Sequence, residues 1–217
     1  MNAPVERNLC LFDLDETLLP LDSDHAWGEF VIRLGWVDEG EFRRRNDGFY
    51  AQYKAGRLAI HAYIEFATEP LRARSLEEIN QAHARFMREV ILPNLRAEAL
   101  ALVQDHRTRG DWVALVTATN DFVTGPIARA FGIADLLAVR LERGHGGTIT
   151  GRIQGTPSYR EGKVSRVEEW LAHRGAVWGD FARITVYSDS PNDLPLLERA
   201  TEPVATNPSP ALEATAR

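Results

Sequence analysis

Four short apolar segments, set apart by much longer stretches, constrain the fold of this chain more than any other feature. They are residues 9–12, 112–116, 184–187 and 203–205, and each is rich in residues that favour strands. Apolar residues follow one another in these segments instead of alternating with polar ones, which indicates strands buried on both faces. Such strands are typical of a parallel sheet with helices on both sides.

Helical patterns lie between these strands. Apolar residues recur at helical spacing in residues 95–109, 127–131 and 164–171, and a glycine follows each segment closely. Pro126 is expected in the first turn of the second of these helices. Glycines among the apolar residues of 136–153 predict a β-hairpin beside the sheet. The alternation of strands and helices predicts an α/β fold with a doubly wound, Rossmann-like parallel sheet.

The stretch between the first two strands is too long for one crossover helix. Residues 22–90 carry two apolar stripes at helical spacing, and Ser75 with Glu78 forms a capping-box pattern at the start of one of these helices. We therefore predict a helical cap domain over residues 22–90, inserted after the first strand. Residues 1–21 and 91–217 are expected to form the α/β core domain.

Composition narrows the class of protein and of partner. With 44% hydrophobic and 26% charged residues the chain fits a globular protein, and its single cysteine, Cys10, lies in an apolar run where a buried thiol is expected. No disulfide framework, signal peptide over residues 1–8 or membrane-spanning run is found, so we expect a reducing, cytoplasmic environment and no membrane partner. The net charge of −6 argues against nucleic acid, and no pattern indicates an oligomeric state.

Two acids, Asp13 and Asp15, directly follow the first strand. The carboxyl ends of the strands in a parallel sheet open onto the ligand crevice. Two neighbouring acids there are costly unless they are paired or bind a cation, and a hard cation such as Mg²⁺ takes carboxylate oxygens together with a substrate phosphate. The pair therefore favours a metal and phosphate site over two solvated acids in a turn.

A second acidic motif, Asp189 and Asp193, follows the strand at residues 184–187. These acids are expected to face the first pair across the crevice and to complete an octahedral oxygen site. Taken alone, Asp193 fits nearly as well as the cap of the helix that follows. Together with the first motif, it favours a metal site.

Two single residues fit the same site less specifically. Thr117 follows the strand at residues 112–116, where a hydroxyl and backbone N–H groups can hold phosphate oxygens. Lys163 opens a helix, where a lysine is mildly unfavourable against the helix dipole unless a phosphate lies within reach. A solvated surface position explains Lys163 equally well.

The candidate residues follow one another along the chain as two acids, a hydroxyl, a lysine and two further acids. This order resembles the four motifs of the haloacid dehalogenase superfamily of phosphatases, and the resemblance covers nearly the whole chain. The matching residues, in chain order, are Asp13, Asp15 and Thr17, then Thr117, then Lys163, then Asp189 and Asp193. The segment YSDSPNDLPLL at residues 187–197 and the helical insertion are similar to the phosphoserine phosphatase branch. Glu16, where a small residue is usual, and residues 117–120, which replace a glycine-rich turn, depart from that branch.

The resemblance implies a Mg²⁺-dependent phosphomonoester hydrolase in which Asp13 is the nucleophile and becomes an aspartyl phosphate. It implies Mg²⁺ ligands from the Asp13 carboxylate, the Asp15 main-chain carbonyl and Asp189. Asp15 would protonate the leaving alcohol and then deprotonate water. Lys163 would stabilise the charge on the phosphoryl group, and Asp193 would orient Lys163 or a metal-bound water.

The same resemblance implies a small phosphate ester as substrate. Its phosphoryl group would be held by Thr117, by Asn192 and by backbone groups at Leu14 and Ala118. An amine-bearing ester such as phosphoserine or histidinol phosphate is expected, because in phosphoserine phosphatases an acid that enters the cap contacts the substrate's amino group. Asp22 stands at a comparable distance from the nucleophile. A turn or a helix cap explains Asp22 equally well.

Two other protein classes fit part of the pattern. A receiver-type phosphorylation switch also uses acids, a threonine and a lysine on a doubly wound sheet, but it lacks a long helical insertion and a second acidic motif. A catalytically inactive phosphate-binding protein would share the fold, although every chemical position is filled in this chain. Phosphate release from a general aryl phosphate, with and without Mg²⁺, distinguishes these classes.

Overall fold

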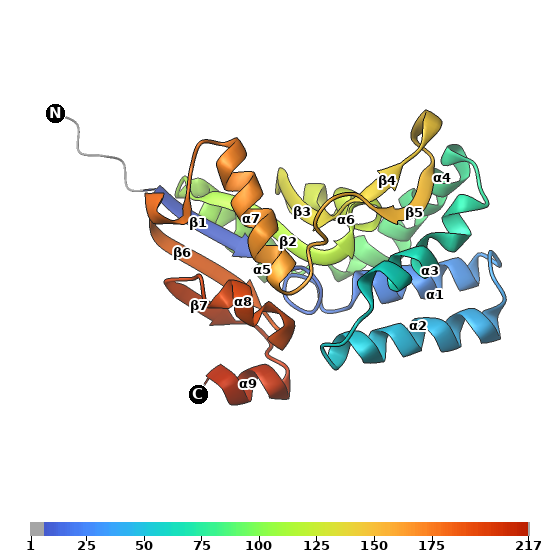
Figure 1. Cartoon of the computed structure of the whole chain (residues 1–217), viewed down its shortest axis with the longest axis horizontal. Helices are drawn as coiled ribbons and strands as arrows, with labels where there is room; N and C mark the ends of the chain where they lie inside the picture. The colour runs from blue at the N-terminus through green and yellow to red at the C-terminus, as the bar shows by residue number, and fades with distance from the viewer. Residues whose placement is uncertain (1–6, 217) are drawn as a thin grey trace.

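A five-stranded parallel sheet forms the centre of the protein in the computed structural model, which describes residues 7–216 (Figure 1). Its order is β3-β2-β1-β6-β7, and each neighbouring pair of strands is parallel. The strands are β1 (Arg7–Phe12), β2 (Trp112–Asn120), β3 (Asp135–Val139), β6 (Phe181–Ser188) and β7 (Glu202–Ala205). The doubly wound parallel sheet expected from the sequence is confirmed, and each of the four predicted strands lies in it.

Apolar clusters fill both faces of this sheet. The helices of this part of the chain are α5 (Ala97–Thr108), α6 (Asp121–Ala130), α7 (Glu161–His173), α8 (Leu194–Leu197) and α9 (Pro210–Ala216). Cys10 and Phe12 of β1 belong to a cluster with α5 and α6, whereas Leu9 and Leu11 belong to a cluster with α7 and α8. Cys10 is fully buried as expected, and burial raises the pKa of its thiol, which makes it an unreactive core residue.

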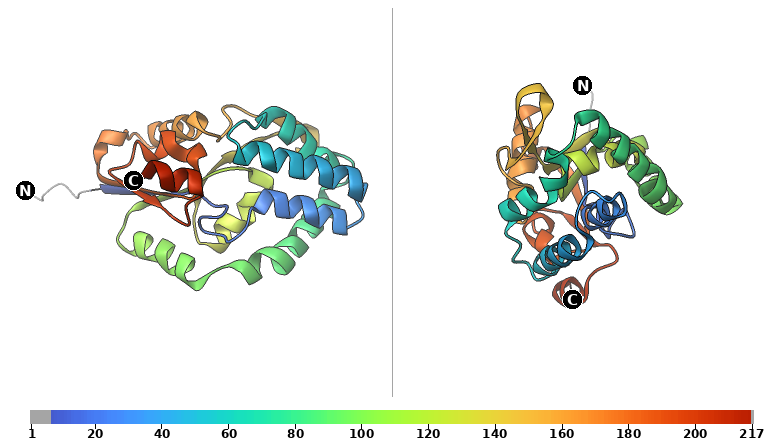
Figure 2. Two further views of the ribbon diagram at one scale, coloured as in Figure 1. Left: turned by 90° about the horizontal axis from the view of Figure 1, so that it is seen from below. Right: turned by 90° about the vertical axis from the view of Figure 1, so that its right-hand side faces the viewer.

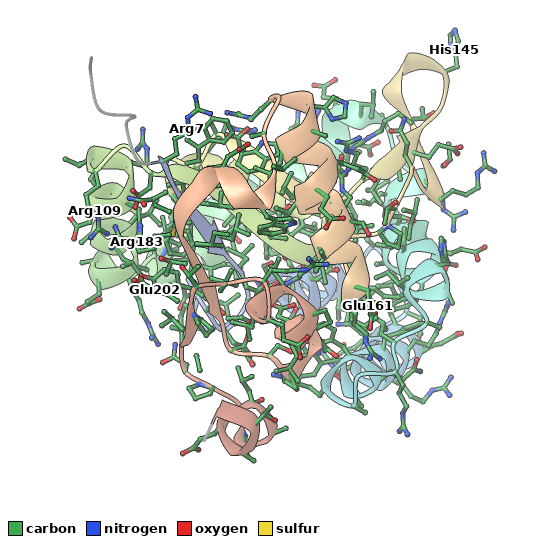
Figure 3. The ribbon with its side chains drawn as sticks, turned by 60° about the vertical axis from the view of Figure 1, so that its left-hand side comes forward. Arg7, Arg109, His145, Glu161, Arg183 and Glu202 are labelled. Atoms are coloured by element: carbon green, nitrogen blue, oxygen red, sulfur yellow. The ribbon has the colours of Figure 1, made fainter. Side chains whose placement is uncertain are left out.

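The segment at residues 136–153 differs in part from the single hairpin that was predicted. Its first residues form β3, a strand of the main sheet that pairs with β2. The hairpin is shorter and consists of β4 (Leu141–Arg143) and β5 (Ile149–Ile153), with His145 at its tip (Figure 3). Both parts of the segment are apolar in sequence. What distinguishes the sheet strand from the hairpin strands is its pairing with β2, which lies far from it in the sequence.

Helix α6 begins earlier than predicted. Pro126 was expected in its first turn, but it lies inside the helix, and that prediction is wrong. The helix starts at Asp121 because the side chain of Asn120 accepts a hydrogen bond from the N–H of Val123 at 3.1 Å. The capped first turn fixes the start of the helix. The helix tolerates the loss of the one backbone hydrogen bond that Pro126 cannot donate.

Four helices follow β1 in the segment predicted as a cap: α1 (Ser23–Arg33), α2 (Glu39–Lys54), α3 (Ile60–Arg72) and α4 (Leu76–Phe86). A π-helical turn (Met87–Ile91) and a 3₁₀ turn (Leu92–Asn94) lead back to α5. The capping box of Ser75 and Glu78 at the start of α4 is confirmed. Figures 1 and 2 show these helices together at one end of the sheet. The division into a core (1–21 and 91–217) and a cap (22–90) stays a prediction.

The inserted helices lie at the end of the sheet where the strands finish. Arg7, the first residue of β1, lies with Arg109 and Glu202 at the opposite end (Figure 3). No helix in residues 7–216 has the length and apolar character needed to cross a lipid bilayer. Residues 1–6, which make up most of the segment where no signal peptide is predicted, lie outside the described residues.

Candidate active site

The residues of all four motifs meet at the carboxyl ends of β1, β2 and β6. The chain runs from β1 outward through β2 and β3 on one side, and then crosses to β6 and β7 on the other side of β1, which makes this edge a topological switch point. Asp13 follows β1, Asp189 follows β6, and Thr117 lies in β2, which extends beyond its predicted end to Asn120. Lys163 lies near the start of α7, and Figure 1 shows that end of α7 next to the loop that follows β1. These four side chains are buried, each with at most 4% exposed.

Lys163 is the positive centre of this site. Its Nζ donates hydrogen bonds to Oδ1 of Asp13 and to Oδ2 of Asp193, both at 2.7 Å. Lys163 is 1% exposed, so the alternative of a solvated surface position is wrong. Asp193 precedes α8 but makes no capping hydrogen bond there, and its Oδ2 also accepts a hydrogen bond from Ser188 at 2.7 Å. The carboxylate of Asp193 therefore holds Lys163 against Asp13.

Asp15 is held by two donors on different elements. Its Oδ1 accepts a hydrogen bond from the N–H of Ser23 at 2.7 Å, and its Oδ2 accepts one from the hydroxyl of Thr119 at 2.8 Å. Burial, and then the charge of Asp22, raise the pKa of Asp15 to about 7. A carboxyl group with a pKa near neutrality is suited to both donating and accepting a proton. Ser23 and Thr119 were not predicted as site residues, because single hydroxyl or backbone donors carry no sequence signal of their own.

Negative charge exceeds positive charge around Asp13. Burial, Asp193 and Asp15 raise the pKa of Asp13 to about 7 against the opposing effect of Lys163. Burial and then the charge of Asp13 raise the pKa of Asp189 to about 8. The hydroxyl of Thr17 lies 3.4 Å from both Oδ2 of Asp13 and Oδ1 of Asp189, so it joins the two carboxylates. Such a pair of buried carboxylates is suited to a bound cation.

The donor set fits a hard cation. Asp13 and Asp189 offer carboxylate oxygens, and the proposed third protein ligand is the main-chain carbonyl of Asp15, a combination typical of Mg²⁺ sites that also take phosphate and water oxygens. Within residues 7–216, no three acid, histidine or cysteine side chains come together in a metal-binding arrangement. The proposed Mg²⁺ site needs only two such side chains, those of Asp13 and Asp189, together with the main-chain carbonyl of Asp15.

The residues predicted to contact substrate differ in their surroundings. Leu14 is fully buried in the apolar core, which leaves only its backbone to meet a ligand. Asn192 donates its side-chain N–H to the carbonyl of Tyr53 at 2.9 Å, and so connects the site to the inserted helices. Asp22 caps α1, because its Oδ1 accepts a hydrogen bond from the N–H of His25 at 2.8 Å. The helix-cap interpretation of Asp22 is therefore confirmed.

A cavity lies beside Asp15, between the inserted helices and the end of β2. Acidic, aromatic and small residues line it: Asp15, Asp22, Asp24, His25, Asn46, Phe49, Tyr50, Tyr53, Leu58, Tyr63, Ala118 and Thr119. Ala118 and Asp22 thus line the same cavity, whereas Trp27, Phe30 and Phe66 of the insertion are buried in the core. The cavity offers room for the part of a substrate that extends away from Asp15.

Polar contacts tie the end of α2 to the loop after β1. Glu16 accepts a hydrogen bond from the hydroxyl of Tyr50 at 3.1 Å and forms an ion pair with Lys54. Arg160 donates to the carbonyl of Gly56 at 2.8 Å. Glu16 has φ of 59°, a region that favours small residues, which explains why a small residue is usual at this position. The inserted helices are therefore closed over the site.

The match to a family model is decisive for the class of protein. The model described as haloacid dehalogenase-like hydrolase matches residues 10–198. The chain belongs to the haloacid dehalogenase-like hydrolases. The match contains all four motifs, so the family expected from the sequence is confirmed, as is its enzymatic class.

Relatives of this haloacid dehalogenase-like hydrolase include named phosphatases. It is 43% identical, over 97% of its length and 95% of the other chain, to a histidinol-phosphatase of Neisseria meningitidis serogroup C. A crystal structure of a protein of unknown function from Bordetella pertussis is 52% identical, with a TM-score of 0.91, and covers 98% of this chain and 95% of that one. A substrate-bound phosphoserine phosphatase, 18% identical, shares the fold with a TM-score of 0.70 over 97% of this chain and 91% of that one.

In this haloacid dehalogenase-like hydrolase, Thr119→Val is expected to slow the hydrolysis of alkyl phosphates by roughly 10-fold. The substitution keeps the shape of the side chain but removes the hydroxyl that holds Oδ2 of Asp15. Alkyl esters need their leaving oxygen protonated and aryl esters need this far less, so rates on an aryl phosphate should change little. Steady-state rates on both esters test this, and Thr119→Ser should keep most activity. An equal loss on both esters would show that Thr119 does not act through Asp15.

Proposed function

We propose that this phosphatase hydrolyses small phosphate monoesters through an aspartyl phosphate on Asp13, with Mg²⁺ as its cofactor. The observation that carries this proposal is the buried Asp13 carboxylate with Nζ of Lys163 at 2.7 Å, beside the carboxylate of Asp189. A nucleophilic carboxylate approaching a phosphate dianion needs positive charge nearby. Lys163 supplies part of it, and Mg²⁺ bound by Asp13, Asp189 and the carbonyl of Asp15 would stabilise the remaining charge on the phosphoryl oxygens.

The proposed reaction has two chemical steps, formation and then hydrolysis of the aspartyl phosphate, and each side chain of the site has a role in them. A carboxylate oxygen of Asp13 attacks phosphorus and displaces the alcohol, while Asp15 gives its proton to the leaving oxygen. Asp15 then takes a proton from water as the water attacks the phosphorus of the aspartyl phosphate, which releases inorganic phosphate and restores both carboxyl groups. Asp193 keeps Lys163 in place during both steps. Thr117 and backbone N–H groups hold phosphoryl oxygens.

The proposed substrate is an amine-bearing alcohol phosphate, and histidinol phosphate is favoured over phosphoserine. The relative from Neisseria meningitidis, which matches over 97% of the chain, is named a histidinol-phosphatase. The acidic cavity beside Asp15 is suited to a positively charged alcohol. Asp22, with one oxygen engaged by the amino end of α1, is proposed to contact the amino group.

Phosphate release from p-nitrophenyl phosphate should require Mg²⁺. The purified protein is expected to lose nearly all activity in excess EDTA and to recover it when Mg²⁺ is added back, because two buried carboxylates with raised pKa values need a cation beside them. Circular dichroism in EDTA serves as the control for folding. Catalytic release at any Mg²⁺ concentration excludes an inactive binding protein, and single-turnover phosphorylation without release would instead favour a receiver-type switch. Full activity in EDTA would contradict the proposed cofactor.

A further inference from the structure

Within residues 7–216, the cavity beside Asp15 is lined by acids that no lysine or arginine of its lining balances. Within the described part of the chain, its lining contains three carboxylates, Asp15, Asp22 and Asp24, and neither lysine nor arginine. Its histidine, His25, has Nε2 2.9 Å from Oδ1 of Asp47, so any charge it gains by protonation is paired with an acid that does not line the cavity. The cavity therefore favours a ligand that brings positive charge and disfavours one that brings a carboxylate.

Asp24 is the most unusual of these carboxylates. Only 6% of the residue is exposed, and its Oδ1 accepts a hydrogen bond from the side-chain N–H of Asn120, a neutral donor, at 3.2 Å. Burial, and then the neighbouring charge of Asp22, raise the pKa of Asp24 well above its ordinary range, and a hydrogen bond from Tyr63 only partly opposes this. A carboxyl group in such surroundings gains most from a nitrogen-bearing group that reaches it from the ligand side.

Aromatic rings also line the cavity that contains Asp24. Phe49, Tyr50, Tyr53 and Tyr63 all line the cavity, and the rings of Phe49 and Tyr63 contact each other with centroids 5.3 Å apart. Aromatic faces stabilise flat rings and cations alike. The combination of a buried acid with aromatic walls suits a protonated nitrogen heterocycle better than an aliphatic chain.

The direction of the substrate follows from the position of Asp15. If Asp15 protonates the leaving oxygen, as proposed, the rest of the alcohol must extend from that oxygen into the cavity that Asp15 lines. Asp22 and Asp24 both lie at the start of α1 but have different partners, since Asp22 accepts a hydrogen bond from the N–H of His25 and Asp24 accepts one from Asn120 at the end of β2. The two acids can therefore each contact a different group of the alcohol. An alcohol with two nitrogen-bearing groups fits this pair of acids.

We infer that Asp24 determines substrate specificity, by accepting a hydrogen bond from a second nitrogen-bearing group of the alcohol, such as an imidazole ring, and by excluding alcohols that carry a carboxylate. This inference rests on the proposed function and sharpens it. Histidinol has an amine and an imidazole and no carboxylate, so it satisfies both acids. Serine has an amine and a carboxylate, and its carboxylate finds no lysine or arginine among the described residues that line the cavity.

The effects of the amine, the imidazole and the carboxylate can be measured separately with four phosphate esters: histidinol phosphate, phosphoethanolamine, phosphoserine and p-nitrophenyl phosphate. The wild type should prefer histidinol phosphate, with phosphoethanolamine next among the alkyl esters and phosphoserine last. Asp24→Asn should lower kcat/KM on histidinol phosphate by roughly 10- to 100-fold, the effect of losing one charge-assisted hydrogen bond. The loss of kcat/KM on phosphoethanolamine should be several-fold smaller. The preference for histidinol phosphate over phosphoserine, as the ratio of their kcat/KM values, should decrease. Asp22→Asn should instead lower kcat/KM on all three amine-bearing alkyl esters.

Binding of the free alcohols gives a result that needs no catalysis. Calorimetry should find histidinol bound by the wild type and weakened by Asp24→Asn and by Tyr63→Phe, with serine bound poorly by all three proteins. Glu29→Gln, on the same helix but outside the cavity, is the matched control and should behave as the wild type. Equal losses of Asp24→Asn on all four esters, or serine bound as well as histidinol, would overturn the role of Asp24. Absence of phosphate release from every ester would contradict the proposed function alone, because the binding result stands apart from it.

Discussion

Asp13→Asn is expected to lower kcat by at least about 10³- to 10⁴-fold on every phosphate ester, because it removes the nucleophile itself. The side-chain amide keeps an oxygen that can accept the hydrogen bond from Lys163, so the buried network that now has a 2.7 Å contact should survive. Steady-state phosphate release and thermal unfolding, measured on the same preparation, test both parts of this expectation. The substituted protein should still bind the substrate.

The control for this variant is the same chemical change at an exposed position. Asp105 lies on the exposed face of α5, away from the strand ends, and Asp105→Asn should keep wild-type activity. If Asp13→Asn retained activity within about tenfold of the wild type while Asp105→Asn behaved normally, a nucleophilic role for Asp13 would be excluded.

Lys163→Met is expected to damage both catalysis and stability. The substitution leaves Asp13 and Asp193 buried without the ammonium group that each contacts at 2.7 Å. Removing one partner of a buried ion pair typically lowers the free energy of unfolding by about 3–5 kcal/mol. Loss of the positive charge at the phosphoryl group should also lower kcat by roughly 10²- to 10³-fold. Urea unfolding in EDTA, where Mg²⁺ cannot compensate, measures the first effect.

A second substitution identifies the cause of the stability loss. The double variant Lys163→Met with Asp193→Asn leaves one buried carboxylate fewer, so it should recover part of the lost stability while remaining inactive. If Lys163→Met cost less than about 1 kcal/mol, Lys163 would not be the residue that balances these acids. A double variant less stable than the sum of both single losses would lead to the same conclusion.

The strand ends and their acids could be predicted from the sequence because each signal is local. Asp13 and Asp189 each follow a short, continuously apolar segment, and a parallel sheet brings the carboxyl ends of such segments together. The order of the motifs then indicated the family. Lys163 remained ambiguous, since a lysine near a helix start looks the same whether it is solvated or pairs with acids from other elements.

Contacts between distant segments account for what the sequence could not predict. Thr119 holds Asp15 across 104 positions of sequence, and Asn120 meets Asp24 across 96, and no periodicity links these residues. β3 was assigned to the hairpin for the same reason, because its partner β2 lies before α6. The start of α6 was misplaced because Pro126 is a stronger local signal than the side chain of Asn120 that caps the helix.

Chemical trapping of the intermediate tests the proposed mechanism most directly. The wild-type protein is mixed with Mg²⁺ and substrate, quenched in acid during turnover and treated with borohydride, which reduces an aspartyl phosphate to homoserine. Peptide mass spectrometry should find homoserine at position 13 only when substrate is present, and never in the Asp13→Asn variant. Homoserine at Asp15 or Asp189 instead, or active turnover with position 13 unmodified at every quench time, would contradict an aspartyl phosphate on Asp13.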